Sequence, residues 1–136
     1  PQGKSRLLAY VWPDQTQRLG RIRAAIDVAH SSGVRVESAD AADWVESQVA
    51  VRPGTTTILL HSMLWQYMPK ERQHALFGTL EQIGARATDI APFVWLRMEP
   101  RLGDMSTIEL RSRVWPGGED RLLANVHPHG AWIEWL

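Results

Sequence analysis

A group of polar and aromatic side chains follows a short apolar run near the middle of the chain, and these side chains are the strongest candidates for chemistry. The group consists of His61, Ser62, Trp65, Gln66 and Tyr67. The preceding run, residues 57–60, is β-branched and apolar, which is typical of a strand buried on both faces. Open α/β sheets bind ligands at the carboxyl ends of such strands. We therefore predict that these five residues form a pocket for a small molecule.

His61 is the candidate catalytic residue of this group. The imidazole has an ordinary pKa of about 6.5, which suits a general base or a group that orients substrate. The alternative is a hydrogen-bonded, partly buried histidine at the edge of the pocket. Ser62 does not fit a serine nucleophile, because the chain has no G-x-S-x-G turn and neighbouring residues in a strand point to opposite faces. Trp65, Gln66 and Tyr67 either contact a planar ligand or pack their rings into the core.

Two further histidines, His127 and His129, are separated by one residue near the end of the sequence. In an extended segment both rings would face the same side, as paired metal ligands do. Pro128 and Gly130 favour a turn instead, and no third ligand is evident from the sequence. We predict a structural turn whose imidazoles hydrogen-bond to the backbone, and we assign no metal site.

A helix predicted directly after the polar group would position it. Pro69 suits the first helical turn, and Glu71 places negative charge where the helix dipole favours an anion. Apolar residues then recur at helical spacing, at Leu76, Leu80, Ile83 and Ala87. The strand at 57–60, the polar group and this helix form the unit around which the rest of the fold is predicted.

The residues before this unit are predicted to form two strands and two helices. The run Leu7–Trp12 is apolar and closed by a proline, which favours a strand, with a short helix as the alternative. A helical stripe follows and ends at Gly33; its members are Leu19, Ile22, Ile26 and Ala29. The run Val34–Glu37 is predicted as a second strand. Asp40 is then predicted to cap a helix that carries Ala41, Trp44, Val45 and Val49.

The residues after the central helix are predicted to be strands. The run Pro92–Met98 is a buried strand, and Thr107–Trp115 alternates apolar with charged residues, which is typical of a half-solvated antiparallel strand. Turns containing glycine and proline separate two further strands, 121–126 and 131–136. The predicted fold class is α/β: one domain, residues 1–136, with a Rossmann-like, mainly parallel sheet flanked by helices and a carboxyl-terminal antiparallel meander.

Composition excludes several classes of partner. Fifteen basic residues balance fifteen acidic ones, so the net charge gives no general attraction for nucleic acid or an acidic membrane, and we predict neither partner. There is no cysteine for a disulfide or a thiolate zinc site. No apolar stretch approaches the roughly 20 residues that cross a bilayer, and no signal peptide opens the sequence, so a cytoplasmic location is predicted. An open sheet edge would favour a homodimer.

Several aromatic motifs together resemble one bacterial family. They are the runs at 10–15, 39–44, 95–99, 115–118 and 127–132, together with His61-Ser62 followed by Trp65-Gln66-Tyr67. The resemblance is to the carboxyl-terminal part of the uncharacterised family catalogued as domain of unknown function 2332, and it covers nearly the whole chain. It implies that this chain is the carboxyl-terminal part of a longer protein.

Members of that family in turn resemble class I S-adenosylmethionine-dependent methyltransferases. In this comparison Asp40 and Ala41 match an acidic-then-apolar pair that faces the adenine, and residues 61–63 match the end of a strand that lines the methyl-transfer pocket. The comparison also implies a helix over Leu7–Trp12. The chain has no glycine-rich cofactor loop, so no cofactor is assigned to it alone, and S-adenosylmethionine is expected only in a longer form.

Two functions follow, and the sequence leaves undecided whether the protein is an enzyme. The first is a methyltransferase-like fragment with a pocket at the carboxyl ends of the strands, which would act mainly by positioning its reactants. The second is a non-catalytic binding or assembly module that keeps a Rossmann-like sheet and uses its tryptophan-rich surface for protein contacts.

Overall fold

The computed structural model describes residues 2–136, which form a mixed α/β structure with four α-helices and one open, five-stranded sheet. The chain divides into two compact units, with the boundary between Ser38 and Ala39. The prediction that residues 1–136 act as one domain stays a prediction. None of the helices in the described part of the chain is long and apolar enough to cross a membrane.

The first unit is a pair of helices, α1 (Gln2–Ala9) and α2 (Thr16–Ser32). The strand predicted for Leu7–Trp12 is wrong, because the run begins inside α1 and continues into a turn. Leucine and alanine are good helix formers, and Pro13 restrains only the residue before it, which lies beyond the helix. The predicted helix α2 is confirmed, and it ends at Gly33 in the left-handed conformation, with φ of 67°. The strand predicted for Val34–Glu37 is wrong, since these residues have no regular structure and join no strand of the sheet.

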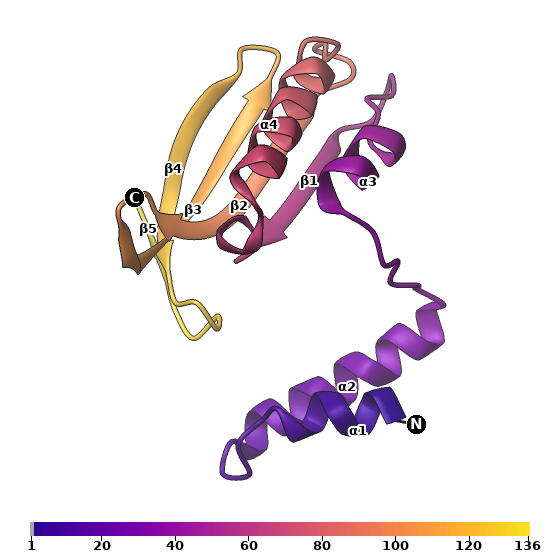
Figure 1. Cartoon of the computed structure of the whole chain (residues 1–136), viewed down its shortest axis with the longest axis vertical. Helices are drawn as coiled ribbons and strands as arrows, with labels where there is room; N and C mark the ends of the chain where they lie inside the picture. Colours follow the sequence, from indigo (N-terminus) through magenta and orange to yellow (C-terminus); the bar gives the residue numbers. More distant parts are fainter. Residues whose placement is uncertain (1) are drawn as a thin grey trace. The chain divides into compact units, whose positions relative to one another are not determined.

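The second unit is built on the sheet, whose strands lie in the order in which they occur along the chain (Figure 1). They are β1 (Thr57–Ser62), β2 (Phe93–Arg101), β3 (Asp104–Trp115), β4 (Glu119–Val126) and β5 (Ile133–Trp135). Only β1 and β2 are parallel, and helix α4 (Lys70–Gly84) connects them. The other three pairs are antiparallel. The predicted terminal meander is therefore confirmed, and the sheet is mainly antiparallel, which corrects the prediction of a mainly parallel one.

Strand β1 lies at the edge of the sheet, where it was predicted to be buried on both faces. The side chains of Ile58 and Leu60 are 60% and 63% exposed, while Leu59 between them is half-buried against the helices. A run of apolar residues carries no alternation that would separate a strand covered on both faces from one covered on a single face. The sequence therefore indicated the strand correctly and its surroundings incorrectly.

The main core lies between the sheet and helix α4 (Figure 1). The predicted stripe of α4 is confirmed for Leu76, Leu80 and Ile83, which are buried and pack against rings of the sheet. Its fourth predicted member, Ala87, lies beyond the end of the helix and is partly buried against the same core. The ring of Phe93 stacks on that of Trp115, with centroids 5.3 Å apart. Helix α3 (Ala41–Gln48) completes this core from beside β1 and contributes two buried side chains, Ala42 and Val45. A smaller buried cluster is formed by side chains of β3 and β4 and consists of Ile108, Ala124 and Val126.

Candidate ligand-binding site

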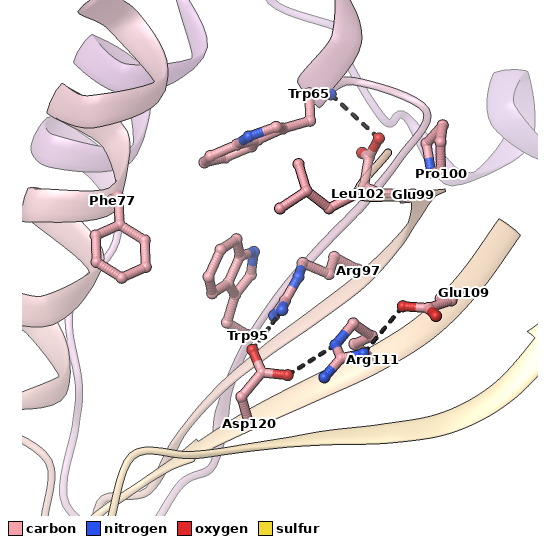
Figure 2. Close-up of a pocket in the computed structure, with 10 residues that line it drawn as sticks. All are labelled: Trp65, Phe77, Trp95, Arg97, Glu99, Pro100, Leu102, Glu109, Arg111 and Asp120. Atoms are coloured by element: carbon pink, nitrogen blue, oxygen red, sulfur yellow. Dashed lines mark hydrogen bonds and ion pairs between the residues drawn. The ribbon is translucent and has the colours of Figure 1, made fainter. Parts of the chain in front are cut away.

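A pocket with a volume of about 380 Å³ opens on the face of the sheet that α4 covers (Figure 2). Strand β2 supplies four of its ten residues, the 3₁₀ turn after β1 (Trp65–Tyr67) supplies a ring, and β3 and β4 supply Glu109, Arg111 and Asp120 on the charged side. The lining residues are Trp65, Phe77, Trp95, Arg97, Glu99, Pro100, Leu102, Glu109, Arg111 and Asp120. The pocket therefore lies at the carboxyl ends of the two parallel strands, where the sequence predicted a site.

Alternation along β2 explains why this strand dominates the pocket. Trp95, Arg97 and Glu99 are two residues apart, so all three side chains point to the same face. Arg97 is paired with Arg111 of β3, which places two cations directly opposite each other. Such a pair is unfavourable by itself. Asp120 of β4 lies between the two cations and offsets the repulsion.

The charged side of the pocket is a continuous network of ion pairs. One oxygen of Asp120 accepts from Arg97 Nη2, and the other accepts from Arg111 Nε at 2.8 Å. Glu109 accepts from Arg111 Nη1 at 2.9 Å and from Arg101 Nε at 2.6 Å. Figure 2 shows Arg97, Glu109, Arg111 and Asp120 on one side of the opening and the Trp65 indole on the other. All four carboxylate oxygens of this network are therefore bonded.

Both carboxylates of the network are held in their ionised form. Burial raises the pKa of Asp120, but hydrogen bonds from Arg97 and Arg111 lower it further, and the net pKa lies below its ordinary value of 3.8. The same balance holds for Glu109, whose pKa lies below 4.5 because the hydrogen bonds from Arg101 and Arg111 outweigh burial. The network thus stays ionised at neutral pH.

The His61 ring contacts the rings of Trp65 and Trp95, which form the aromatic wall of the pocket. Both ring nitrogens of His61 are hydrogen-bonded. Trp95 Nε1 donates to His61 Nε2 at 2.9 Å, and His61 Nδ1 lies 2.8 Å from Glu99 Oε1. An indole N–H can only donate, so Nε2 must be the acceptor and Nδ1 must carry the proton that faces Glu99. This arrangement describes a neutral histidine in one fixed tautomer. A catalytic role for His61 would require one of these bonds to break.

Glu99 anchors the chain segment between β1 and the 3₁₀ turn. Besides His61, its carboxylate accepts from the backbone N–H of Leu64 at 2.8 Å and of Trp65 at 3.3 Å. The Trp65 ring is stacked on the His61 ring, with centroids 6.0 Å apart. Glu99 therefore fixes the position of the ring that forms one wall of the pocket.

The structure brings together only some of the predicted site residues. Trp65 lines the pocket, and Gln66 lines a neighbouring depression of about 260 Å³ that shares Trp65 with it. Ser62 is exposed and points to the opposite face of the sheet from His61, because the two are neighbours in one strand. Tyr67 is 78% exposed and lines neither hollow.

Asp40 and Ala41 lie at the start of α3 and line neither hollow. Asp40 is the predicted helix cap, since its carboxylate accepts from the backbone N–H of Ala42 at 2.8 Å and of Asp43 at 3.3 Å. It also pairs with Arg72 of α4, whose hydrogen bond is the main cause of the lowered pKa of Asp40. The capping role is confirmed, and the cofactor-binding role stays a prediction.

Sequence reasoning missed the charged side of the pocket. The alternation of Glu109 and Arg111 indicated a solvated face of β3, yet Glu109 is only 8% exposed and Val114 on the other face is 41% exposed. The useful signal was the spacing of two residues in β2, which places Arg97 and Glu99 on the same face as Trp95. Combining the two strands requires their pairing, which the sequence does not provide.

The segment at 127–130 is the predicted structural turn. The backbone N–H of Gly130 donates to the carbonyl of His127 at 2.9 Å, and the backbone N–H of His129 donates to His127 Nδ1 at 3.1 Å. Within residues 2–136, no group of three or more histidine or acidic side chains is arranged to hold a metal ion.

Comparison with known proteins gives one match. A family model, described as "Uncharacterized protein conserved in bacteria (DUF2332)", matches residues 1–135. No curated protein and no solved structure matches the chain. The family match covers nearly all of the sequence, as the aromatic motifs predicted. The chain therefore belongs to this family of uncharacterised bacterial proteins.

Proposed function

We propose that this chain is a binding domain for a small, planar organic molecule, which occupies the pocket between Trp65 and the ion-paired network. The observation that carries the proposal is the pocket itself: an aromatic wall faces a set of fixed charges across a space of about 380 Å³. Ligand sites commonly combine such rings with a few well-placed polar groups. The position at the carboxyl ends of β1 and β2 supports the same interpretation.

The polar groups of the pocket favour binding over a reaction at protein side chains. His61 has both nitrogens engaged, and the carboxylates of Glu109 and Asp120 each accept from two arginines. The lone pair of His61 Nε2 is engaged by Trp95, and the lowered pKa values of Glu109 and Asp120 make both carboxylates weak bases. The arrangement is therefore suited to holding a ligand in one orientation.

A panel of planar fragments, followed by two-dimensional NMR of the ¹⁵N-labelled chain, tests this proposal. We expect at least one fragment to shift the indole N–H signals of Trp65 and Trp95, while the distant indole of Trp132 stays unchanged. Trp65→Leu removes the ring that forms one wall of the pocket and should abolish this binding. If no fragment shifts the Trp65 and Trp95 signals at millimolar concentration, the proposal fails.

A finer version of this proposal is the methyltransferase-like fragment that the resemblance implies. Methyl transfer depends on positioning more than on a protein base, so a pocket that holds its ligand through engaged groups is compatible with it. The Rossmann-like part would then be the parallel unit of β1, α4 and β2, with S-adenosylmethionine bound in a longer form of the protein. In a thermal-shift titration, S-adenosylmethionine should raise the melting temperature of that longer form and leave the melting temperature of this chain unchanged. No shift of the longer form at millimolar cofactor would exclude the idea.

A second candidate function, assembly, is favoured by the open edge of β1. The backbone N–H groups of Thr57 and Met63 donate to carbonyl oxygens of Pro92 and Met98, on the β2 side of β1. Because successive residues of a strand direct their backbone groups to opposite sides, those of Ile58 and Leu60 point outward, away from β2. The strand carries no charged side chain and no proline, which are the usual protections of an edge. Two copies could therefore pair antiparallel about a two-fold axis, with each Ile58 opposite the partner copy's Leu60.

Sedimentation of the purified chain tests this assembly. We expect a dimer whose dissociation is promoted by Ile58→Lys, because a charge would then face the apolar edge of the second copy. The matched control is Val36→Lys, which changes an exposed valine outside the sheet. A wild-type monomer at high concentration would exclude this function and leave the ligand-binding proposal intact.

A further inference from the structure

One buried hydrogen-bond donor of the pocket has no acceptor, and this donor bears on what the pocket binds. Arg97 Nη1 is buried and has no hydrogen-bond partner. The same guanidinium donates through Nη2 to Asp120, and it lies over the Trp95 ring with 4.2 Å between its Cζ and the ring centroid. A buried N–H without an acceptor is costly, and a ligand that supplies one removes that cost.

The acceptors around Arg97 are already occupied. Asp120 accepts from two arginines through its two oxygens, and so does Glu109. Glu99 is engaged by His61 and by two backbone N–H groups. A ligand that donates hydrogen bonds would share oxygens that already accept from the protein, whereas a ligand that accepts them would supply the partner that Arg97 Nη1 lacks.

The charges of the network point the same way. Three guanidinium groups, those of Arg97, Arg101 and Arg111, face the two carboxylates of Glu109 and Asp120. The carboxylate of Glu99 lies toward His61 and the backbone of the 3₁₀ turn, where three N–H groups solvate it. The ion-paired network therefore has one cation in excess, which the charge of Glu99 balances over the pocket as a whole, so the attraction for an anion is local to Arg97.

We infer that the ligand of the proposed pocket is a planar organic anion, an aromatic carboxylate, which places its ring against Trp65 and its carboxylate against Arg97. This inference rests on the proposed function and adds the chemical class of the ligand. A guanidinium binds a carboxylate through charge-assisted hydrogen bonds, often two in parallel. Because Trp95 and Asp120 already orient Arg97, little further ordering is needed on binding.

Three naphthalene derivatives of the same shape test the inference on the whole chain. They are 2-naphthoate, the neutral 2-naphthamide and the cationic 2-naphthylmethylammonium, and their affinities are measured by calorimetry together with the NMR signals of Trp65 and Trp95. We expect 2-naphthoate to bind at least about tenfold more tightly than the other two, since only it provides two anionic acceptors. Its affinity should fall as salt is raised.

Two substitutions locate the carboxylate. Arg97→Met keeps the length of the side chain and removes the donors, so it should weaken 2-naphthoate at least about tenfold and 2-naphthamide much less. Arg121→Met removes a guanidinium from an exposed ion pair outside the pocket and should change neither affinity. The comparison of the three probes with the wild-type chain decides the question even if Arg97→Met does not fold.

The outcomes separate the two proposals. Preference for 2-naphthoate that is lost in Arg97→Met supports the inference. Equal or tighter binding of the amide or of the ammonium compound overturns the inference and leaves the binding proposal standing. If none of the three probes shifts the signals of Trp65 and Trp95, the inference falls, and failure of the wider fragment panel then removes the proposed function as well.

Discussion

Glu99 offers the sharpest test of how this site is built. Its side chain is only 11% exposed and accepts hydrogen bonds from His61 Nδ1, Leu64 N and Trp65 N. Replacement by alanine leaves these three donors without an acceptor. A buried donor that loses its partner costs about 1–3 kcal/mol. The long bond to Trp65, at 3.3 Å, should contribute least, and water from the pocket should reach part of the gap.

We therefore expect Glu99→Ala to lower the free energy of unfolding by about 3 kcal/mol. Urea denaturation followed by circular dichroism measures this change, and amide hydrogen exchange should show faster exchange at Leu64 and Trp65 than in the wild type. Glu99→Gln keeps the volume of the side chain and one acceptor oxygen, so its loss should be smaller, about 1–2 kcal/mol. The control Glu46→Ala lies on the exposed side of α3 and should change the free energy by less than about 0.5 kcal/mol.

A cost of Glu99→Ala below about 1 kcal/mol, the lower limit for one buried donor, would contradict the proposed role of the carboxylate. That role is also refuted if the amides of Leu64 and Trp65 keep their protection, because the carboxylate would then not be their acceptor. A loss of stability confined to ligand-bound protein would show that the network forms only around a ligand.

Three further predictions concern the framework of the second unit. A Cβ atom at Gly84 would lie 2.5 Å from the Trp115 indole, so Gly84→Ala should lower the free energy of unfolding by about 1–3 kcal/mol. A Cβ atom at Gly78, in the same helix, meets nothing within 4 Å, so Gly78→Ala should raise it by up to about 1 kcal/mol. Chemical denaturation of both variants measures the two changes. Leu80 is fully buried, so Leu80→Ala should cost about 2–5 kcal/mol in the same assay, and Leu102→Ala, which changes a fully exposed side chain, should cost almost nothing. The hydroxyl of Ser106 and then that of Thr107 lower the pKa of Asp104 from 3.8 to about 2, so its ionised form stabilises the folded β2–β3 hairpin above pH 3.8, and this contribution should be lost as the pH falls toward 2. Hydrogen exchange of the hairpin amides at several pH values measures the loss, and Asp104→Asn should make exchange in this range independent of the carboxylate.

Local signals in the sequence predicted the elements of this chain well. The stripe at Leu76, Leu80 and Ile83 identified α4, and Asp40 identified the start of α3, because side-chain spacing and capping depend on residues only a few positions apart. The alternation in 107–115 identified an antiparallel strand for the same reason. The aromatic motifs also led to the correct family.

The two incorrect strands show where local signals are ambiguous. Leu7–Trp12 has apolar residues that suit a helix or a strand equally, and the helix forms because α2 is available to pack against it. Val34–Glu37 has β-branched residues but no neighbouring strand to complete a ladder. Packing decides both cases, because α1 packs against α2, the next helix along the chain, and residues 34–37 form no ladder.

The sequence by itself predicted α2, α3, α4 and the strands of the sheet, excluded cysteine chemistry, and indicated Trp65 as a candidate for the pocket. Tertiary structure decided that β1 is an edge strand, that His61 is held between Trp95 and Glu99, and that the opposite side of the pocket is charged. The physical reason is that the charged network joins Arg97, Arg111 and Asp120, which come from three strands. Strand pairing alone brings these residues together, and pairing depends on long-range packing that local residue patterns do not encode.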